Sequence, residues 1–381
     1  MSNSPGIHLV YQPTASSQLG AYMESWYAGR GHSVHRIDCR ASAWARVGPA
    51  LRAFHPRRDV WYRRRWEAGL YSPSAWDRNS RANGRLLDRM WKPGDKILQI
   101  AKEYFPHPRY EEMEYFVFVN YNTRLACADG YTPWRPNDSD LAPFLEREDR
   151  LFRSATHVFT AGEFLRRNLI EASGVRPDRV TTVRNGVNPH YLANPPPVLP
   201  DRFTYRLLFV GWDFGLKGGR DLLRAWPAIR ARVPRAELLI LGPDAAQRAS
   251  MGEAADQPGI RWESRKVTFD DYRAADLFVL PSLRDSYGFV FLEAMSQGLP
   301  CLGADINGMP EMIVPGETGY IVPRQSPDHI AESICRYYED ESNRARMGRL
   351  ALERIRTHFT WDVVLGQVNT IMGLARPESK G

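Results

Sequence analysis

Cysteine is scarce in this sequence of 381 residues, and its four copies, Cys39, Cys127, Cys301 and Cys335, lie far apart. No C-x-x-C pair occurs, so the spacing of a zinc site or of a redox pair is missing. A dense disulfide framework is typical of small secreted domains, and this spacing is unlike one. The cysteines therefore predict a reducing, cytoplasmic compartment.

Long apolar runs are also missing. No stretch approaches the ~20 apolar residues that a membrane-spanning helix needs. The first residues, MSNSPGIHLVYQP, have neither a basic leader nor a small-residue cleavage site, so we expect no secretory signal. Hydrophobic residues at 43% and charged residues at 25% are ordinary for a globular protein and exclude a disordered chain.

Lysine supplies only six of the 51 basic residues, so arginine carries most of the positive charge. The densest basic stretch is RAFHPRRDVWYRRRW at residues 52–66, in a chain of formal net charge +7. Such a patch suits phosphate groups, lipid headgroups or nucleic acid, although a solvated arginine-rich surface explains it as well. We expect no nucleic-acid partner and leave open a peripheral contact with an anionic membrane.

Apolar runs alternate with amphipathic stretches along the chain. In the first half we expect strands at 7–11, 33–37, 115–120, 157–160 and 180–184, and helices at 19–27, 140–152 and 163–172. In the second half we expect strands at 207–210, 237–241, 277–280, 300–303 and 319–322. Helices are expected there at 219–233, 270–274, 287–297, 327–338, 344–357 and 361–374. Strand, helix and strand at such spacing indicate parallel pairs joined by crossovers.

Residues 188–200, NPHYLANPPPVLP, separate the two series. Their five prolines cannot lie inside a helix or a central strand, so we interpret the stretch as a hinge. The predicted fold is α/β, with two Rossmann-like doubly wound parallel-sheet domains that face each other across a cleft. The first covers 1–190 and is joined by the C-terminal helix 361–381; the second covers 203–360. Ligands of such sheets bind at the carboxyl ends of the strands.

GWDFGLKGG, residues 211–219, follows a predicted strand and precedes a predicted helix. Glycines such as Gly211 and Gly218 let backbone amides approach an anion, the helix N-terminus adds partial positive charge, and Lys217 adds a full one. The pattern is neither a Walker A loop nor a dinucleotide fingerprint. An ordinary strand-to-helix turn with a surface lysine is the alternative.

DSYGFVFLEAMSQGLP, residues 285–300, is the most informative stretch. Helix amides near Gly288 could meet a diphosphate, and the carboxylates of Asp285 and Glu293 could accept hydrogen bonds from hydroxyls. Glu293 lies on an otherwise apolar helix, where a buried acid is costly unless it has a partner. For Asp285 the alternative is a helix N-cap.

These segments resemble the donor-site signature of glycosyltransferase family 4, which are retaining, sugar-nucleotide-dependent transferases of the GT-B fold. The stretch LPSLRDSYGFVFLEAMSQGLPCLGADINGMPEMIVPGETGYIVP is similar to the family pattern E-x7-E, A-M-A-x-G-x-P and G-G-x-x-E, with Asp285 at the first glutamate and Glu293 at the second. Asn307-Gly308 stands at the double glycine. FVGWDFGLKGG resembles F-V-G-R-L-x-x-x-K-G, with Lys217 at the phosphate-binding lysine and Trp212 at its partner arginine.

The resemblance implies a role for each matching residue. Glu293 would hold the ribose hydroxyls, Asp285 would lie near the hydroxyls of the donor sugar, and Lys217 would bind the diphosphate and stabilise the leaving group. The other implied donor-site residues are Gly211, Trp212, Gly218, Lys266, Ser286, Tyr287, Gly288 and, in the first domain, Gly20. Asn120, Tyr121 and Asn122 stand where many relatives have a histidine near the reacting sugar, and which of them acts there is open.

The predicted activity is transfer of a sugar from a nucleotide-diphosphate-sugar donor to a hydroxyl of a glycan, lipid-linked or small-molecule acceptor. Cations and helix amides at the diphosphate would stabilise its charge without a metal or another cofactor. Asp138-Ser139-Asp140 has the lettering of a metal-binding D-x-D, but it opens a predicted helix and is interpreted as a cap. The alternatives are a phosphorylase-like or sugar-phosphate-using enzyme of the same fold, and a non-catalytic polyanion- or membrane-binding protein.

Overall fold

The computed structural model describes residues 6–11, 19–38, 72–100, 104–105, 112–130, 139–196, 198–200 and 202–374. The basic stretch at 52–66, Cys39 and Asp138 lie outside these residues. The chain divides into two compact units, Met1–Arg184 with Leu365–Gly381, and Asn185–Val364. None of the helices in the described ranges is both long and apolar enough to cross a membrane.

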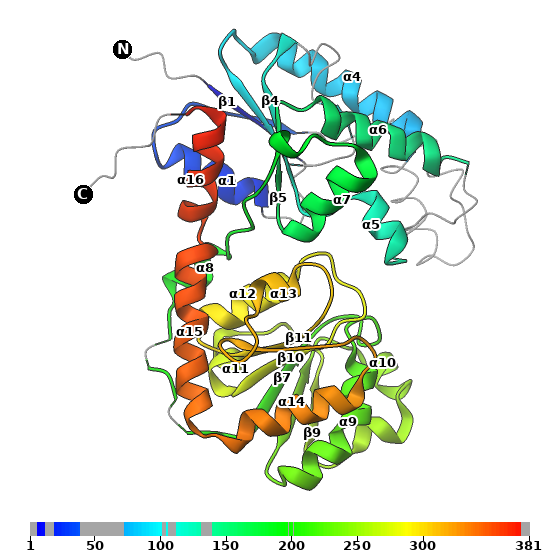
Figure 1. Cartoon of the computed structure of the whole chain (residues 1–381), viewed down its shortest axis with the longest axis vertical. Coiled ribbons are helices and arrows are strands. Elements are labelled where there is room, and N and C mark those ends of the chain that lie inside the picture. The colour runs from blue at the N-terminus through cyan, green and yellow to red at the C-terminus, as the bar shows by residue number, and fades with distance from the viewer. Residues whose placement is uncertain are drawn as a thin grey trace. The chain divides into compact units, whose positions relative to one another are not determined.

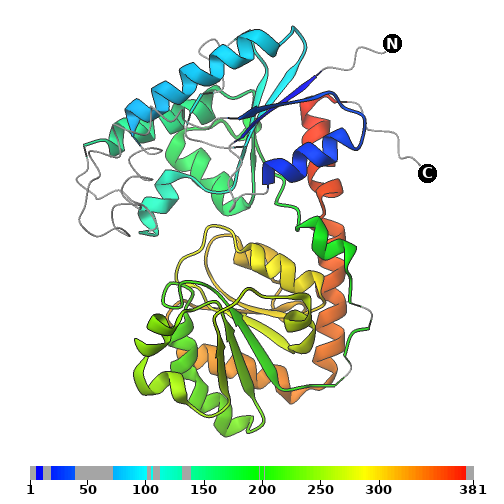
Figure 2. The same ribbon diagram turned by 180° about the vertical axis from the view of Figure 1, so that it is seen from behind.

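In the first unit the described strands form a six-stranded parallel sheet in the order β2-β1-β3-β4-β5-β6. The strands are β1 (Ile7–Tyr11), β2 (Val34–Asp38), β3 (Lys96–Gln99), β4 (Tyr115–Val119), β5 (His157–Thr160) and β6 (Val180–Thr182). The helices are α1 (Leu19–Ala28), α4 (Pro73–Met90), α5 (Thr123–Ala128), α6 (Leu141–Ser154), α7 (Glu163–Ser173) and the 3-10 helix η3 (Pro177–Arg179). Helices α4 and α6 cover one face of this sheet, and α1 and α16 (Trp361–Met372) cover the other (Figures 1 and 2).

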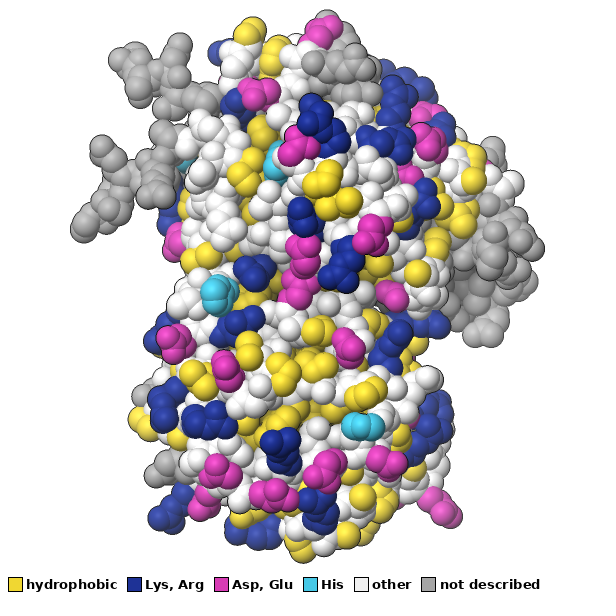
Figure 3. Space-filling view, in the orientation of Figure 1, with side chains coloured by type: hydrophobic (Ala, Val, Ile, Leu, Met, Phe, Trp, Pro, Cys, Tyr) yellow, Lys and Arg dark blue, Asp and Glu magenta, His cyan; other side chains and the backbone are white. Residues whose placement is uncertain are grey.

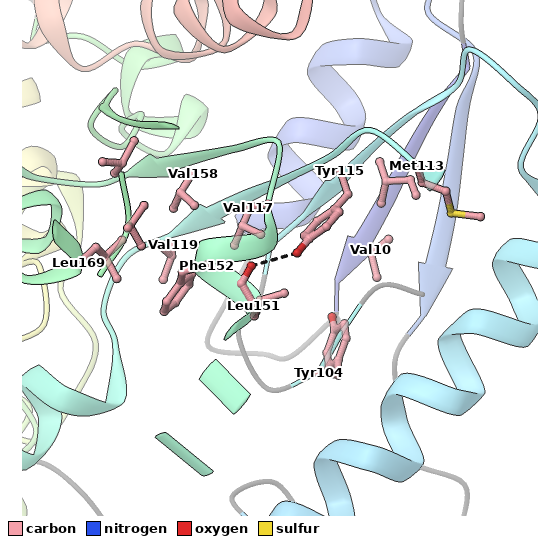
Figure 4. Packing of buried hydrophobic residues seen from close by; sticks show 14 of the residues in the cluster. Val10, Tyr104, Met113, Tyr115, Val117, Val119, Leu151, Phe152, Val158 and Leu169 are labelled. Atoms are coloured by element: carbon pink, nitrogen blue, oxygen red, sulfur yellow. Dashed lines mark hydrogen bonds between the residues drawn. The ribbon is translucent and has the colours of Figure 1, made fainter. Parts of the chain in front are cut away.

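Successive side chains of the buried strands point to opposite faces of this sheet. On β4, Tyr115, Val117 and Val119 join the cluster that packs against α4, α6 and α7 (Figure 4). The Tyr115 ring is fully buried, and its hydroxyl donates a hydrogen bond of 2.9 Å to the carbonyl of Leu151 on α6. On the other face, the buried hydroxyl of Tyr27 on α1 donates to Oδ1 of Asn369 on α16 at 2.8 Å.

In the second unit the described strands form another six-stranded parallel sheet, in the order β12-β11-β10-β7-β8-β9. The strands are β7 (Arg206–Val210), β8 (Glu237–Leu241), β9 (Ile260–Glu263), β10 (Leu277–Leu280), β11 (Cys301–Ala304) and β12 (Gly319–Val322). The helices are α8 (Pro189–Ala193), α9 (Gly219–Arg232), α10 (Ala245–Ala249), the 3-10 helix η4 (Gly252–Asp256), α11 (Phe269–Ala274), α12 (Phe289–Ser296), α13 (Met309–Met312), α14 (Pro327–Glu339) and α15 (Ser342–His358). Helices α9 and α14 lie on one face of the sheet, and α12 and α13 on the other (Figure 1).

The predicted α/β class with two parallel sheets is confirmed. The stretch interpreted as a hinge differs from its prediction, because it begins with the short helix α8. Pro189 occupies the first turn of α8, where the N–H that proline lacks would have no helical partner. The prolines therefore limit this helix to a single turn rather than exclude it.

Candidate functional site

The loop between β7 and α9 is built closely against the loop that follows β10. Gly218, the N-cap of α9, has a left-handed backbone with φ of 76°, and a Cβ atom there would lie 1.9 Å from the carbonyl oxygen of Pro281. The amides of Leu283 and Arg284 donate to the carbonyl of Leu216 and tie the same two loops together. Glycine is thus required at position 218, where the loop enters α9.

Lys217 and Asp285 meet at this junction. The Nζ of Lys217 lies 2.6 Å from Oδ2 of Asp285, although the two residues are 68 positions apart. Their side chains are 28% and 12% exposed, so the ion pair is partly buried. Asp285 does not cap α12, because the N-cap of that helix is Gly288 and the Asp285 side chain is engaged with Lys217. The capping alternative for Asp285 is therefore wrong.

The turn that leads into α12 combines a buried aromatic ring with a glycine. Gly288 has φ of 95°, a conformation that side chains other than hydrogen disfavour. Tyr287 is buried, and its hydroxyl accepts a hydrogen bond of 3.3 Å from the amide of Asn185. The Tyr287 side chain therefore anchors this turn in the interior of the unit. Ser286, between Asp285 and Tyr287, is half-buried.

Asn307 stands where the resembled family has the first of two glycines, and the structure explains the change. Its backbone has a positive φ of 46°, which asparagine tolerates better than other side chains. Its Nδ2 donates 2.7 Å to the carbonyl of Asp285. Asn307 thus keeps the glycine-like turn and adds a hydrogen bond that fixes the loop of Asp285.

Glu293 is the predicted buried acid of α12, and it does have partners. The hydroxyls of Tyr272 on α11 and Tyr191 on α8 donate to its Oε2 at 3.0 and 3.1 Å. Burial raises the pKa of Glu293, while the two hydrogen bonds act in the opposite direction. Burial also raises the pKa of Tyr272 well above its usual value, so its hydroxyl stays protonated and donates. Neither tyrosine was predicted from the sequence, although a buried acid needs hydrogen-bond donors and so indicates that such donors lie nearby.

Trp212, at the position of the expected arginine, is 62% exposed. Its backbone is fixed by Gln247, whose Nε2 donates 2.6 Å to the Trp212 carbonyl and whose Oε1 accepts 3.0 Å from the amide of Phe214. The buried Phe214 ring packs against Trp262 and anchors the loop. The loop therefore presents an indole, and not a second cation, beside Gly211 and Lys217.

The loop after β9 holds Arg265 and Lys266, where the resemblance places base recognition. Arg265 forms ion pairs with two acidic residues. It donates to both carboxylate oxygens of Asp271 at 2.7 Å and to Glu263 at 2.6 Å. These contacts raise the pKa of Arg265 and hold the loop against α11. Lys266 is exposed.

In the first unit, the three polar residues after β4 differ in the hydrogen bonds that their side chains make. Asn122 is fully buried, caps α5 by accepting from the amide of Leu125 at 3.0 Å, and donates to Asn168 at 2.7 Å. The hydroxyl of Tyr121 donates to Asp129. The buried Oδ1 of Asn120 has no hydrogen-bond partner among the described residues.

Gly20 lies in the first turn of α1, next to β1. A Cβ atom there would lie 2.4 Å from the ring of Tyr11, so close packing against this ring explains why the residue is glycine. The diphosphate role of Gly20 stays a prediction.

No group of three or more histidine, cysteine, aspartate or glutamate side chains in the described ranges could hold a metal ion. Asp140, the last residue of the D-x-D lettering, is at the N-cap position of α6, but its side chain makes no capping hydrogen bond. Its backbone is helical rather than extended, so the carboxylate does not reach the amides that a cap would satisfy. Asp140 thus occupies the predicted cap position without the capping hydrogen bond, and Asp138 lies outside the described residues.

The strand order explains why the loops of Lys217 and Asp285 meet. From β7 the chain proceeds through β8 and β9 on one side, and then through β10, β11 and β12 on the other. The order therefore reverses between β7 and β10, which pair directly through Leu207 and Leu277. In open parallel sheets the carboxyl ends of the strands at such a switch point are the usual ligand site.

Known proteins share this architecture. Residues 204–340 match the family model of glycosyl transferases group 1. D-inositol 3-phosphate glycosyltransferase from Corynebacterium glutamicum (strain R) is 30% identical over 184 residues, which are 44% of this chain and 43% of that protein. The chain thus spans less than half of the length of this relative.

Two solved structures resemble the whole chain. Sucrose-phosphate synthase from Thermosynechococcus elongatus has a TM-score of 0.68 and 18% identity, with 96% of this chain and 98% of that chain covered. HepE from Anabaena, solved in complex with UDP, has a TM-score of 0.65 and 13% identity, with 97% and 99% covered. The fold is therefore that of the GT-B glycosyltransferases. The range matched by the family model, residues 204–340 of the second unit, includes Lys217, Asp285 and Glu293.

Proposed function

We propose that this protein is a retaining, metal-independent glycosyltransferase of family 4. It transfers a sugar from a nucleotide-diphosphate-sugar donor to a hydroxyl of a glycan, lipid-linked or small-molecule acceptor. The observation that carries the proposal is the meeting of Lys217 and Asp285 at the switch point of the second sheet, with the N-termini of α9 and α12 close in sequence to them. The match of residues 204–340 to glycosyl transferases group 1 supports it.

Each residue has a chemical task in this proposal. Departure of the diphosphate leaves negative charge on its oxygens, which the Lys217 ammonium and the partial positive charge at the N-termini of α9 and α12 stabilise. Glu293 accepts hydrogen bonds from the ribose, and Asp285 accepts them from the donor sugar. Lys217 can serve the diphosphate only if its contact with Asp285 is shared or broken. The donor therefore competes with Asp285 for the Lys217 ammonium when it binds.

In the first unit, Asn120 is the best candidate to face the reacting sugar. Tyr121 and Asn122 already use their side chains within the unit, whereas Oδ1 of Asn120 has no partner among the described residues. An amide oxygen can accept a hydrogen bond from a sugar hydroxyl.

We also infer a cytoplasmic location. Cys301 and Cys335 are buried cysteines that form no disulfide in the described part of the chain, which suits a reducing compartment. Acidic and basic side chains are interspersed on the face shown in Figure 3. The peripheral contact with an anionic membrane depends on residues 52–66, outside the described residues, and stays a prediction.

Nucleotide binding tests the proposal. UDP, GDP and ADP are titrated by calorimetry into the wild-type protein and into Lys217→Ala, Glu293→Ala and Lys96→Ala. Lys96, which pairs with Glu114 in the first unit, is the matched control for loss of a paired lysine. We expect saturable binding of one nucleotide that weakens at least tenfold in Lys217→Ala and Glu293→Ala and is unchanged in Lys96→Ala. Equal affinity in all four proteins, or no binding at all, contradicts the proposal.

The donor sugar is found by a second measurement. A panel of sugar nucleotides that share the bound base is incubated with the wild-type protein, without added metal and with a chelator, and released diphosphate is measured. Slow hydrolysis of one donor, abolished in Lys217→Ala, is the expected result. Hydrolysis that requires an added divalent cation contradicts the metal-independent mechanism.

A further inference from the structure

We propose that Tyr191 and Tyr272 are positioning residues that hold the Glu293 carboxylate by one oxygen and leave the other to the ribose diol of the nucleotide. The inference rests on the proposed function and extends it, because it assigns the ribose preference of the site to a pair of hydroxyls. One of these hydroxyls is that of Tyr191 on α8, the first helix after the boundary between the two units.

The geometry around the carboxylate is asymmetric. Both tyrosine hydroxyls donate to Oε2, at 3.0 Å from Tyr272 and 3.1 Å from Tyr191. Oε1 has no hydrogen bond with any residue that the structure describes, and it is not among the buried atoms that lack a partner. The two donors therefore fix the rotation of the carboxylate and leave an acceptor oxygen that solvent can reach. A vicinal diol has two hydroxyls that can donate to such an oxygen.

The electrostatic surroundings of Glu293 come from three elements of the second unit. Tyr272 of α11 and Tyr191 of α8 face the carboxylate, and the buried thiol of Cys301 on β11 acts on Tyr272. Besides burial, the two tyrosine hydrogen bonds are the causes that shift the pKa of Glu293 among the described residues. The ionised form of Glu293 thus depends on these hydroxyls, which favour the carboxylate over the neutral acid.

Tyr191 is held firmly enough to position another side chain. Its ring packs edge-on against Phe269 at 5.0 Å between centroids and against Tyr272 at 6.0 Å. Its carbonyl accepts a hydrogen bond of 3.2 Å from Nε2 of Gln297, the C-cap of α12. Arg273 of α11 donates 2.8 Å to the carbonyl of Asn194, which follows α8. The segment interpreted as a hinge from its prolines is thus docked on α11 and α12, and it supplies a hydroxyl to the donor site.

A purely structural role is the competing explanation, since a buried carboxylate needs hydrogen-bond donors in any protein. The two explanations differ in what a tyrosine-to-phenylalanine change does to ligand selectivity. Loss of a structural hydrogen bond lowers stability and leaves the preference for a ribose diol unchanged. Loss of a positioning hydrogen bond reduces that preference, because Oε1 is no longer held in one place.

The experiment uses the nucleoside diphosphate that binds best among UDP, GDP and ADP, together with its 2′,3′-dideoxy form. Both ligands are titrated into the wild-type protein, Tyr191→Phe, Tyr272→Phe, Glu293→Gln and the control Tyr337→Phe. Tyr337 is fully buried in the same unit and donates 2.7 Å to the carbonyl of Asp276, so the control also removes one buried tyrosine hydroxyl. Thermal unfolding of each variant shows that it is folded.

We expect the wild type and Tyr337→Phe to prefer the ribose form by about tenfold or more. Glu293→Gln should lose most of this preference, because a neutral amide is a weaker acceptor and must reorient. Each tyrosine variant should lose a large part of it, roughly threefold to tenfold, while its affinity for the dideoxy ligand changes little. Comparing the two ligands in the wild type and in each tyrosine variant gives a double-mutant cycle. This cycle measures the coupling free energy between the tyrosine hydroxyl and the ribose hydroxyls.

The pH dependence is a second readout. Ribose binding needs the Glu293 carboxylate, so the preference for the ribose form falls as the pH drops through the raised pKa of Glu293. Phenylalanine at position 191 or 272 removes a donor that favours the carboxylate, so the fall should begin at higher pH in these variants. The nucleotide's own phosphate titrates near pH 6, but this contribution is common to both ligands and cancels in their ratio.

The outcomes separate the two proposals. If no nucleoside diphosphate binds the wild type, the proposed function fails before the tyrosines are tested. If the wild type binds and Glu293→Gln loses the ribose preference, but both tyrosine variants keep the preference and pH profile of Tyr337→Phe, the positioning role is wrong and the proposed function stands.

Discussion

Gly218→Ala is expected to damage both the stability and the donor site of the second unit. A left-handed backbone costs a non-glycine residue roughly 1–2 kcal/mol, and alanine regains about 0.4–1 kcal/mol of this by restricting the unfolded chain. Gly316 provides the matched control, because its φ of 78° is close to the 76° of Gly218 and a Cβ atom there would meet no atom of the described residues within 4 Å. Gly316→Ala should therefore destabilise by about 1 kcal/mol.

At Gly218 a clash is added to the same conformational cost. The new Cβ would lie 1.9 Å from the carbonyl oxygen of Pro281, and ordinary contact begins near 3.4 Å, so the two loops must separate by 1.5 Å, the difference between these distances. Both groups are backbone-fixed, and overpacking of this kind costs typically about 1–3 kcal/mol. The total destabilisation at Gly218→Ala is then roughly 2–4 kcal/mol.

Urea unfolding of the two variants measures the difference, and nucleotide titration measures its effect on the site. The separation moves the loop of Asp285 away from that of Lys217, so Gly218→Ala should also bind nucleoside diphosphates more weakly, whereas Gly316→Ala should not. Equal losses of stability in the two variants, with equal nucleotide affinity, would refute the claim that the two loops are tightly fitted at this glycine.

Three further changes test other parts of the structure. Lys217→Met should weaken a nucleoside diphosphate by roughly 10- to 100-fold and leave the plain nucleoside unaffected in calorimetry, because the ammonium contacts only the diphosphate; equal weakening of both ligands would speak against this. Asp285→Asn should bind the nucleoside diphosphate a few-fold more tightly, because the internal competitor for Lys217 is removed. The same variant should transfer sugar at least tenfold more slowly. Unchanged nucleotide binding would show that the Lys217–Asp285 ion pair is not displaced. Burial lowers the pKa of His8 despite its hydrogen bond to Asp95. Below about pH 6.5 the unfolded chain therefore takes up a proton that the folded chain resists. The urea midpoint should fall between pH 7 and pH 5, and it should fall less steeply with pH in His8→Gln. The same pH dependence in both proteins would contradict a contribution of His8 to this loss of stability.

Much of the fold could be predicted because its strands are apolar runs bounded by polar turns. The strand β1 matches the predicted range 7–11, and β10 matches 277–280. The helix α4 was missed because its buried face includes Asn79, Ser80 and Asn83 and so lacks an apolar stripe. The strands β3 and β9 were missed because KILQ and IRWE each contain only two apolar residues and so form no apolar run.

For the candidate site, residue types could be predicted but not their partners. Lys217 and Asp285 lie in loops that meet because β7 and β10 are neighbours in the sheet. The order of the strands in a sheet cannot be predicted from the local sequence. The need of Glu293 for a partner follows from its apolar helix. That the partners are Tyr191 and Tyr272 depends on how α8 and α11 pack against α12.

The buried hydrogen bond from Tyr27 to Asn369 has a consequence for how the chain is made. It joins residues 342 positions apart within one unit, whose last part, from Leu365 onward, leaves the ribosome after the other unit is already synthesised. The segment from Asn185 to Val364 can therefore begin to fold during translation, while the first unit waits for its final helix. A nascent chain arrested before Asn369 should expose the face of α1 that this helix covers, and holdase chaperones would be expected to bind it there.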